Sequence, residues 1–433
     1  MSPSARGKGR RAGWLGWPVR LSVGVGVVLA AAAFLAQVAS SAAPVTITLQ
    51  AQQTIQQGLD PLIAAFQLSH PQIKVQASYY TPASPQETQV PIRLAAGNGT
   101  DLVQAISASS GPDSVWPMSK SGLLADLSKQ PWASQTLPVD KPLYSYGGKL
   151  RALDLGFSAL AVLSYNKDYF ASNHLSKPTT FAQLLTLCKT IAAAGQIPIA
   201  FGGGNVFVDM NDLVSLAGNT VFSGDKNWYT KLLAHKTTFA GTAGWTRALQ
   251  MILDMKGASC FDPGVAGDAL PTMLSQFGSG QAAMMFTYGG LNALVLKQDP
   301  NLHVGMFTPP GDTAASTTLT TQPSGGMGIW SKSTHQAPAR TFLAFLAQPK
   351  NLEIFDSLNF LMSSADARKG TPPSFYAELK PSFKAGKVVS AIVSEWPNTQ
   401  IEAAGGADVQ GLFTGQKTIP QILADFDNLI KQP

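Results

Sequence analysis

The chain has 433 residues, of which only 13% are charged, and its formal net charge is +6. This length implies more than one hydrophobic core, because single cores stop growing near roughly 250 to 300 residues. Five positive charges lie near the N-terminus, at Arg6, Lys8, Arg10, Arg11 and Arg20, so the rest of the chain carries about +1. The basic excess therefore gives no indication of nucleic-acid binding, and a nearly neutral surface favours an uncharged ligand.

The N-terminus has the pattern of an export signal. The basic residues precede an apolar run from Leu21 to Val38, and the two together resemble the n-region and h-region of a signal peptide. Small residues at Ser40 and Ala42 allow cleavage after Ala42. The apolar run also approaches the roughly 20 residues of a membrane-spanning helix, so an uncleaved anchor with its basic end inside is the alternative. We therefore predict that residues 1–43 are a signal peptide or an N-terminal membrane anchor.

Cys188 and Cys260 are the only cysteines in the chain. In an oxidising compartment these two cysteines can form a disulfide bond. The alternative is a pair of buried free thiols. The sequence leaves both possibilities open.

The first third of the chain alternates strand and helix patterns. Strand patterns are recognised by alternation of apolar residues and helix patterns by apolar positions three and four apart. A strand, a helix and a second strand in this order imply a parallel sheet. The patterns predict a strand at Val45–Leu49, a helix at Leu59–Leu68, a strand at 73–77, a helix at Gln89–Ala96, a strand at Asp101–Ile106 and a small-residue loop at 107–113.

The segment from Tyr144 to Leu185 joins an apolar crossover to a turn and a capped helix. Gly147 to Lys149 has the composition of a hairpin turn, and Leu160–Tyr165 is an apolar run of strand length. Thr180 is followed three residues later by Gln183, which is the spacing of a capping box. We therefore expect a helix to begin directly after Thr180.

The remaining elements follow the same rules. A glycine-rich segment, AFGGGN at 200–205, precedes a helix predicted from about Asp212 to Ala217. Further helices are predicted at Trp245–Lys256 and Ala337–Ala347, and a last one after Thr418, with an apolar stripe suited to packing on a core.

Several of these segments resemble the extracellular sugar-binding proteins of bacterial ABC importers, the maltose-binding-protein type. The resemblance rests on the strings AAGNGTDLVQ at 95–104, SGLLADLS at 121–128, GKL through YNKDYF and PTTF at 148–181, and FGSGQAAMMFTYGG at 277–290. It covers almost all of the chain after the export segment. It implies an α/β, two-lobed periplasmic-binding-protein-like fold of type II, in which hinge-connected parallel and mixed sheets are flanked by helices.

The resemblance also implies a division into lobes. Residues 44–154 and 322–362 are expected to form lobe 1, and residues 155–321 and 363–433 lobe 2, with the ligand cleft between them. The first of three crossings between the lobes is expected near Asp154 to Gly156.

Many relatives in Gram-positive bacteria carry a lipid-modified cysteine just after the apolar run, whereas this chain has none there. We therefore expect an exported protein, extracellular or periplasmic, that is associated with the cell surface without such a cysteine. If the N-terminal helix is not cleaved, that helix is the anchor.

The motifs of common catalytic and metal sites are missing. The five histidines, at positions 70, 174, 235, 303 and 335, lie far apart without zinc-ligand spacing. The sequence has no nucleophile elbow, no phosphate-binding loop and no dinucleotide fingerprint. We expect no catalytic residues, metal or cofactor. A glycosidase pair drawn from isolated acids such as Asp209, Asp212 and Glu395 is the enzymatic alternative.

Binding a neutral carbohydrate requires flat aromatic faces and planar polar groups. Because ligands bind at the carboxyl ends of strands in such sheets, the cluster Asn205 to Asn211 is a candidate, although it could instead cap a helix near Asp212. The resemblance implies further contacts after the first strand and in the loop up to Asp113, although Asp113 could instead be a helix N-cap, and the tryptophans could be buried in a core. In relatives a tryptophan often follows the glycine pair, where this chain has Leu291. The expected ligand contacts are Gln50, Gln52, Ser109, Asp113, Asn205, Phe207, Asp209, Asn211, Trp245, Tyr288, Gly289, Ser324, Gly325, Arg368 and Trp396.

The resemblance implies a non-enzymatic solute-binding component of an ABC transporter. Such a protein captures a mono- or oligosaccharide by closing its lobes and delivers it to permease subunits in the membrane. We expect a monomer that binds no nucleic acid. The alternatives are a binding protein for another solute, such as a polyol phosphate or peptide, a sensor that presents its ligand to a receptor kinase, and a secreted carbohydrate-active enzyme.

Overall fold

The computed structural model describes residues 43–81, 85–108, 111–136, 140–359, 361–362, 374–390, 396 and 400–431. Val45–Pro433 form one compact unit, to which all of the following description applies. Residues 1–42 of the predicted export segment lie outside the described residues, so the choice between signal peptide and anchor stays a prediction. In the described ranges, none of the helices has both the length and the apolar character that crossing a bilayer requires.

The first sheet has five strands in the order β2-β1-β3-β13-β6. β1 runs parallel to β2 and β3, as the strand-helix-strand order predicts, whereas β13 lies antiparallel to β3 and β6. β13 is thus inserted from a distant part of the sequence, which makes the sheet mixed. The strands are β1 (Val45–Gln52), β2 (Ile73–Tyr80), β3 (Leu102–Ala105), β6 (Ala152–Asp154) and β13 (Gly326–Ile329).

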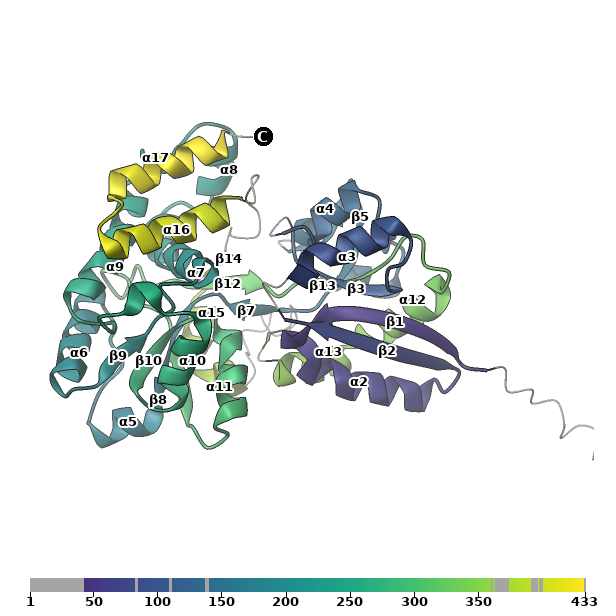
Figure 1. The fold of residues 1–433 in the computed structure, drawn as a ribbon, viewed down its shortest axis with the longest axis horizontal. Coiled ribbons are helices and arrows are strands. Elements are labelled where there is room, and N and C mark those ends of the chain that lie inside the picture. Colours follow the sequence, from purple (N-terminus) through teal and green to yellow (C-terminus); the bar gives the residue numbers. More distant parts are fainter. Residues whose placement is uncertain are drawn as a thin grey trace, which may run out of the picture. The chain divides into compact units, whose positions relative to one another are not determined.

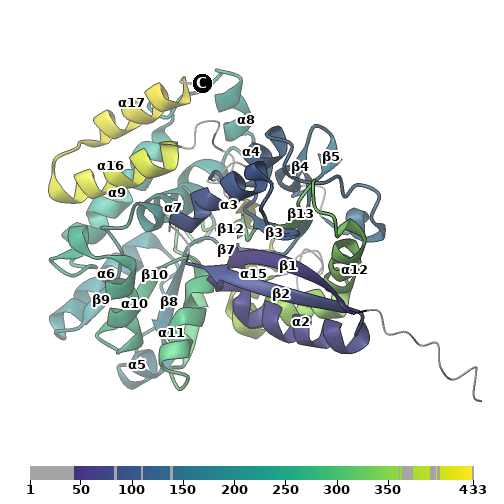
Figure 2. The same ribbon diagram turned by 45° about the vertical axis from the view of Figure 1, so that its right-hand side comes forward.

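Helices cover both faces of this sheet. α2 and α13 pack against each other on one face of β1 and β2, and α3 lies on the opposite side (Figure 1, Figure 2). One apolar core contains residues only from 47–155 and 327–361. The helices are α2 (Gln56–Ser69), α3 (Pro85–Ala96), α4 (Val115–Lys120), α12 (Gln336–Leu346) and α13 (Pro349–Leu358).

The second sheet has the order β11-β8-β10-β9, with β9 parallel to β10 and the other pairs antiparallel. Its strands are β8 (Val162–Asn166), β9 (Ile197–Ala200), β10 (Ala282–Thr287) and β11 (Val304–Phe307). The helix that begins after Thr180 is confirmed, since the Thr180 hydroxyl accepts the Gln183 N–H. The helices of this part are α5 (Lys167–Ser172), α6 (Phe181–Ala193), α7 (Val206–Ala217), α8 (Trp228–Leu233), α9 (Ala243–Gly257), α10 (Leu270–Gly278), α11 (Asn292–Gln298), α15 (Lys380–Lys384), α16 (Gln400–Thr414) and α17 (Ile419–Ile430).

α16 and α17, drawn in yellow, lie side by side, and α16 packs directly on α7 (Figure 1). Two glycines of α16 allow this close approach. A Cβ atom on Gly406 would lie 2.2 Å from the carbonyl oxygen of Val206, and one on Gly405 would lie 2.5 Å from the sulfur of Met210. Because such distances are impossible for real side chains, any other residue would push the two helices apart.

A smaller sheet, β14-β12-β7, carries two of the connections between the larger sheets. Its strands are β7 (Phe157–Ala159), β12 (Leu319–Pro323) and β14 (Val388–Ser390), and a hairpin of β4 (Ser145–Tyr146) and β5 (Lys149–Leu150) precedes β6. The hairpin confirms the turn predicted at Gly147 to Lys149. The predicted lobe boundaries stay a proposal. They are favoured by the composition of the two largest apolar cores, because one contains residues from 47–155 and 327–361 and the other contains residues from 160–307 and 396–426.

Cys188 of α6 and Cys260, in the segment after α9, form a disulfide bond with their Cα atoms 4.8 Å apart. The alternative of two free thiols is therefore wrong. Both residues are fully buried, and the bond ties α6 to the segment that pairs with β9 through the Ile199 N–H and the Cys260 carbonyl.

Asp101, directly before β3, holds three parts of the first sheet together. Its carboxylate accepts the backbone N–H and the hydroxyl of Thr48 at 2.8 and 2.9 Å. It also lies 2.6 Å from the Ser333 hydroxyl and 3.1 Å from Nδ1 of His335. Although burial opposes ionisation, these hydrogen bonds hold the pKa of Asp101 below its usual value. This geometry gives Asp101 a structural role.

Asp101→Asn is expected to lower the free energy of unfolding at pH 7 by about 2–3 kcal/mol. The NH2 group of asparagine cannot accept the hydrogen bonds that Thr48 and Ser333 donate to the carboxylate of Asp101. Because the pKa of Asp101 is lower in the folded state than in the unfolded state, its ionised form stabilises the fold at pH values above the unfolded-state pKa. This contribution is lost as the pH falls through the folded-state pKa. Urea unfolding from pH 7 to pH 3 should therefore show the difference between wild type and variant shrinking. A constant difference would contradict the assignment.

Candidate functional site

Polar side chains converge where β1, β2 and β3 end. Gln52 and Tyr80 are the last residues of β1 and β2 and lie opposite each other in the parallel register. Nε2 of Gln52 donates to Glu87 in the first turn of α3 at 3.3 Å, and its backbone N–H donates to Oε1 of Gln104 at 2.8 Å. The Tyr80 hydroxyl donates to Oδ2 of Asp113 at 2.9 Å. We call Gln52, Tyr80, Glu87, Gln104 and Asp113 the first-sheet polar cluster.

Asp113 is the buried acid of this cluster. Burial raises the pKa of its carboxyl to about 7, the charge of Glu87 adds to this rise, and the hydrogen bond from Tyr80 opposes it. Burial together with the charge and hydrogen bond of Asp113 also raises the pKa of Tyr80, so its phenol stays protonated. Tyr80, Gln104 and Asp113 are buried and support the cluster from behind. The half-buried Gln52 and Glu87 present the amide and carboxyl groups that can donate to and accept from a polyhydroxylated ligand.

A further acid approaches the cluster from α16. Glu402, half-buried in the first turn of that helix, has its pKa raised to about 7 by burial and then by the charge of Glu87. The two glutamates therefore interact electrostatically although they are far apart in the sequence. This places a carboxyl of the part of the chain around the second sheet opposite the first-sheet polar cluster.

The N-terminus of α7 is the second candidate region. Asn205 caps the helix, since its Oδ1 accepts the N–H of Val208 at 3.1 Å. The predicted start near Asp212 is therefore wrong, because the cap lies at Asn205 and α7 begins at Val206. Phe207 is 38% exposed, and its ring is available as an apolar surface.

Asp209 and Asn211 do not reach the surface. Both are buried, and α16 covers the helix that carries them. Burial raises the pKa of Asp209 to about 8, and burial together with Asp209 raises the pKa of Asp212 well above its usual value. Direct ligand contact by Asp209 and Asn211 in this arrangement is excluded by their burial, and the raised pKa of Asp209 favours its protonated form at neutral pH.

The two predicted tryptophans are core residues. Trp245 is fully buried with its ring centroid 5.0 Å from that of Phe239 and 5.3 Å from that of Trp228. Trp396 is buried beside Phe239 and Tyr229. The expectation of ligand stacking by these rings is corrected, because the aromatic core around α9 encloses them.

Tyr288 and Gly289 follow β10. Tyr288 is half-buried. Gly289 is buried, and a Cβ atom at its position would lie 3.2 Å from the Tyr376 hydroxyl oxygen. Leu291, at the position where relatives often have a tryptophan, is buried in a core with Met285 and Val295. Of this turn, only the Tyr288 side chain therefore stays a candidate contact.

Ser324 and Gly325 form one of the crossings. The Ser324 hydroxyl donates to the carbonyl oxygens of Leu155 and Gly156 at 3.1 and 2.9 Å. Gly156 and Gly325 have φ values of +85° and +101°, which favour glycine. Ser324 and Gly325 thus join the connection between β12 and β13 to the connection between β6 and β7. This structural role explains the presence of both residues without a ligand contact.

Gln50 is half-buried on the same face of β1 as Gln52 and stays a candidate by its place alone. Ser109 and Arg368 lie outside the described residues, as does Glu395 of the enzymatic alternative. In the ranges that the structure describes, no three or more His, Cys, Asp or Glu side chains are grouped so as to hold a metal ion.

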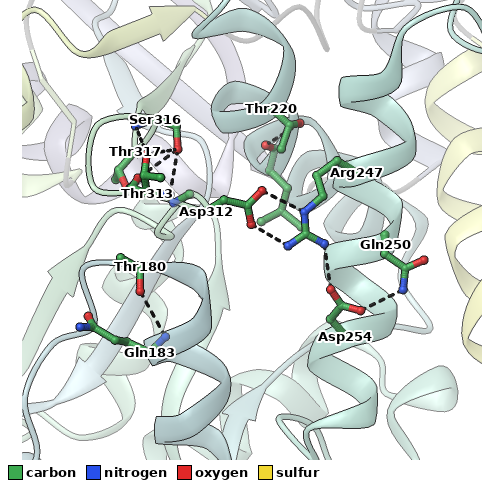
Figure 3. Close-up of polar contacts among 12 residues, drawn as sticks. Thr180, Gln183, Thr220, Arg247, Gln250, Asp254, Asp312, Thr313, Ser316 and Thr317 are labelled. Carbon is green, nitrogen blue, oxygen red and sulfur yellow. Dashed lines mark hydrogen bonds and ion pairs between the residues drawn. The ribbon is translucent and has the colours of Figure 1, made fainter.

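Two arginines that could serve an anionic ligand, Arg151 and Arg247, have other partners. Arg247 on α9 forms a two-pronged ion pair with Asp312 at 2.6 and 3.0 Å and a further one with Asp254 at 2.8 Å (Figure 3). Arg151 donates to the Leu124 carbonyl at 2.9 Å. Neither guanidinium is therefore placed to bind a phosphate group in the candidate site.

The sequence did not single out Tyr80, Glu87, Gln104 or Glu402. Tyr80 could have been found by extending the carboxyl-end rule to the second strand, as had been done for Gln52 on the first. Gln104 lies inside a predicted strand and Glu87 in a predicted helical region, where polar residues are ordinary. Glu402 joins the site only through the packing of α16.

Comparison with known proteins agrees with this architecture. The sequence pattern of a family described as bacterial extracellular solute-binding protein matches residues 50–353. Among curated proteins, none matches the chain.

Similar solved structures include one from a study of xylan utilisation by Caldanaerobius polysaccharolyticus, at 20% identity and a TM-score of 0.73, covering 89% of this chain and 99% of that one. Another is an ABC substrate-binding protein from Listeria monocytogenes in complex with cycloalternan, at 19% identity and a TM-score of 0.70, with 89% and 98% covered. A third is a sugar transporter from Bacillus licheniformis in complex with stachyose, at 16% identity and a TM-score of 0.67, with 89% and 98% covered.

The TM-scores of these structures establish the fold, a type II periplasmic-binding-protein-like architecture. The family match spans well over half of the 433 residues and includes the first sheet apart from the start of β1, its polar cluster and the whole of the second sheet. The chain is therefore a member of the bacterial extracellular solute-binding protein family.

Proposed function

We propose that the protein captures a carbohydrate, a mono- or oligosaccharide, outside the cytoplasm and delivers it to the permease of an ABC transporter. The observation that carries the proposal is the first-sheet polar cluster with Glu402 near it, because the half-buried carboxyl and amide groups of Glu87, Gln52 and Glu402 match the alternating donors and acceptors of sugar hydroxyls. The similar structures from Listeria monocytogenes and Bacillus licheniformis, which contain cycloalternan and stachyose, support this ligand class.

The ligand would lie between two lobes that close on it. Gln52 and Glu87 would bind its hydroxyls from lobe 1, and Glu402 would bind from lobe 2, with the exposed ring of Phe207 as an apolar face for the sugar. Contacts from both lobes exist together only in a closed state, so the ligand shifts the protein towards closure. We propose no catalytic role for the acids.

Export and delivery complete the proposal. The N-terminal segment, as signal peptide or retained anchor, would place the protein outside the membrane, where it acts as a monomer without nucleic acid and presents its loaded form to the permease. N-terminal sequencing of the mature protein distinguishes cleavage from retention.

A panel of neutral mono- and oligosaccharides is expected to contain a ligand that raises the melting temperature and changes tryptophan fluorescence. For that ligand, Glu87→Gln should weaken binding about tenfold or more in calorimetric titration, because a charge-assisted hydrogen bond becomes a neutral one. The amide keeps the shape of the side chain, so the fold should not change.

The matched control is Glu353→Gln on α13, an exposed glutamate outside the cluster, which should bind like wild type. A panel without any response would contradict the carbohydrate assignment. Equal affinity of Glu87→Gln and wild type would instead show that the sugar lies elsewhere.

A further inference from the structure

The loop that joins α3 to β3 contains the only asparagine-glycine pair of the sequence, Asn98 and Gly99. Both residues lie outside regular secondary structure, and Asn98 is exposed while Gly99 is half-buried. Asparagine is one of the chemically labile residues of proteins. A following glycine, which has no Cβ atom, leaves its own backbone nitrogen open to attack the asparagine side chain. The pair therefore has the sequence required for a reaction within the chain.

The backbone nitrogen of Gly99 is available for this reaction. The N–H of Gly97, which has a φ of +85°, donates to the Leu94 carbonyl at 3.3 Å. The N–H of Asn98 donates to the Arg93 carbonyl at 3.1 Å, which completes the C-terminal cap of α3. Among the residues that the structure describes, the N–H of Gly99 has no acceptor. The attacking atom therefore breaks no hydrogen bond before it reacts.

The side-chain amide of Asn98 is equally unrestrained, since it makes no hydrogen bond within the described ranges. Other asparagines of the chain are held in place. Oδ1 of Asn205 accepts the first N–H groups of α7, and the buried Asn219 is hydrogen-bonded through both its nitrogen and its oxygen. On the surface, without such contacts, the Asn98 side chain exchanges between rotamers and can turn its Cγ atom towards the Gly99 nitrogen.

Glycine is required at position 99. A Cβ atom there would lie 2.3 Å from Cδ2 and 3.0 Å from Cα of Leu94 on α3. Any other residue would push the loop away from the helix. The fold therefore retains the second member of the pair, whereas position 98 faces solvent and places no such demand on its side chain.

We propose that Asn98 is a site of spontaneous deamidation through a cyclic imide with Gly99. The Gly99 nitrogen loses its proton to solvent and forms a bond to Cγ of Asn98. The bond between Cγ and the side-chain nitrogen breaks, and this nitrogen leaves as ammonia after taking up a proton. Water then opens the ring at either of its two carbonyl groups, which gives aspartate or isoaspartate at position 98. Water is the only other reactant.

Isoaspartate would change the segment that leads into β3. It adds one carbon atom to the main chain and a carboxylate at the C-terminal end of α3, where a negative charge is unfavourable. Asp101, three residues further on, accepts hydrogen bonds from Thr48 and Ser333. A longer main chain directly before Asp101 would disturb these bonds. The modification is therefore expected to destabilise the first sheet, whichever solute the protein binds.

The test follows the folded, full exported chain during incubation at pH 8 and physiological temperature. Samples are digested at mildly acidic pH, where the reaction is slow, and analysed by peptide mass spectrometry and by enzymatic methylation of isoaspartate. The peptide with Asn98 should convert progressively to forms heavier by the difference between an amide and an acid. Asn301, which is exposed and followed by Leu302, is the internal control, and its peptide should stay unmodified in the same samples.

Asn98→Gln keeps the amide but requires a larger ring, so this variant should accumulate no isoaspartate. After the same incubation it should melt at a higher temperature than wild type. The wild type unfolded in guanidinium chloride gives the rate of the pair without structural restraint. Reaction of the Asn98 peptide in the unfolded chain alone would overturn the proposal. Equal conversion of the Asn301 peptide, or wild-type amounts of isoaspartate in Asn98→Gln, would overturn it as well.

Discussion

Replacing both Cys188 and Cys260 with alanine is expected to lower the free energy of unfolding by about 4 kcal/mol. The disulfide closes a loop with a sequence separation of 72. Loop-closure entropy in the unfolded chain grows with the logarithm of this length, so a long loop gives a large effect. Denaturant unfolding of wild type and double variant measures the difference.

The same loss should appear when wild type is unfolded under reducing conditions, while the double variant should be insensitive to the reductant. This comparison separates the covalent bond from the packing of the two buried side chains, because reduction leaves both sulfur atoms in place. Equal stability of oxidised and reduced wild type would contradict the prediction.

The alternating patterns of the first sheet could be predicted because they depend on local order. The strands beginning at Val45 and Ile73 form with the expected parallel pairing, and the caps at Thr180 and Thr418 start their helices as the spacing with Gln183 and Gln421 indicates. These features arise within a few residues of the chain. Their physical cause, capping of free N–H groups and burial of alternate side chains, is visible in the sequence alone.

The start of α7 and the place of its acids could not be predicted in this way. Two acids and two asparagines between Asn205 and Asp212 have the composition of an exposed loop or helix start. α16, from the far end of the chain, covers this segment because Gly405 and Gly406 leave room for contact between the helices. Burial of Asp209 is therefore a consequence of long-range packing.

In the candidate site, too, some residues could be predicted from local sequence and others are brought in only by long-range packing. Gln52 and Asp113 follow predicted strands, at places where the resemblance to sugar-binding proteins implies ligand contacts. Glu402 approaches Glu87 only through folding. Trp245 and Trp396 failed as ligand candidates for a related reason, since a large aromatic ring beside a helix start can lie in a core or a cleft, and only the surrounding aromatic residues decide.

Asp209→Asn is expected to stabilise the fold at pH 8 by about 2–4 kcal/mol and to flatten the dependence of stability on pH. Burial raises the folded-state pKa of Asp209 to about 8, whereas the unfolded value is about 3.9. Between these values the folded chain holds a proton that the unfolded chain has lost. The wild type is therefore most stable below the unfolded pKa and loses stability as the pH rises towards 8.

The effect of the variant extends to Asp212. Its raised pKa follows from burial and from the negative charge of Asp209, so removing that charge should ease its ionisation. Neither carboxylate oxygen of Asp209 or Asp212 has a hydrogen-bond partner among the described residues, which means that no attractive contact offsets the cost of burying a charge. An asparagine at position 209 keeps the volume of the side chain and removes one of the two titrations.

Urea unfolding of wild type and Asp209→Asn at steps from pH 4 to pH 8.5 measures the two slopes. Glu353→Gln, at an exposed glutamate on α13, is the matched control and should follow the wild-type slope. The two chains should have similar stability near pH 4, where Asp209 is protonated in the folded state, and diverge as the pH rises. Parallel curves would mean that Asp209 is ionised at neutral pH by a partner such as a bound cation or water, and that α7 is more accessible than its packing against α16 indicates.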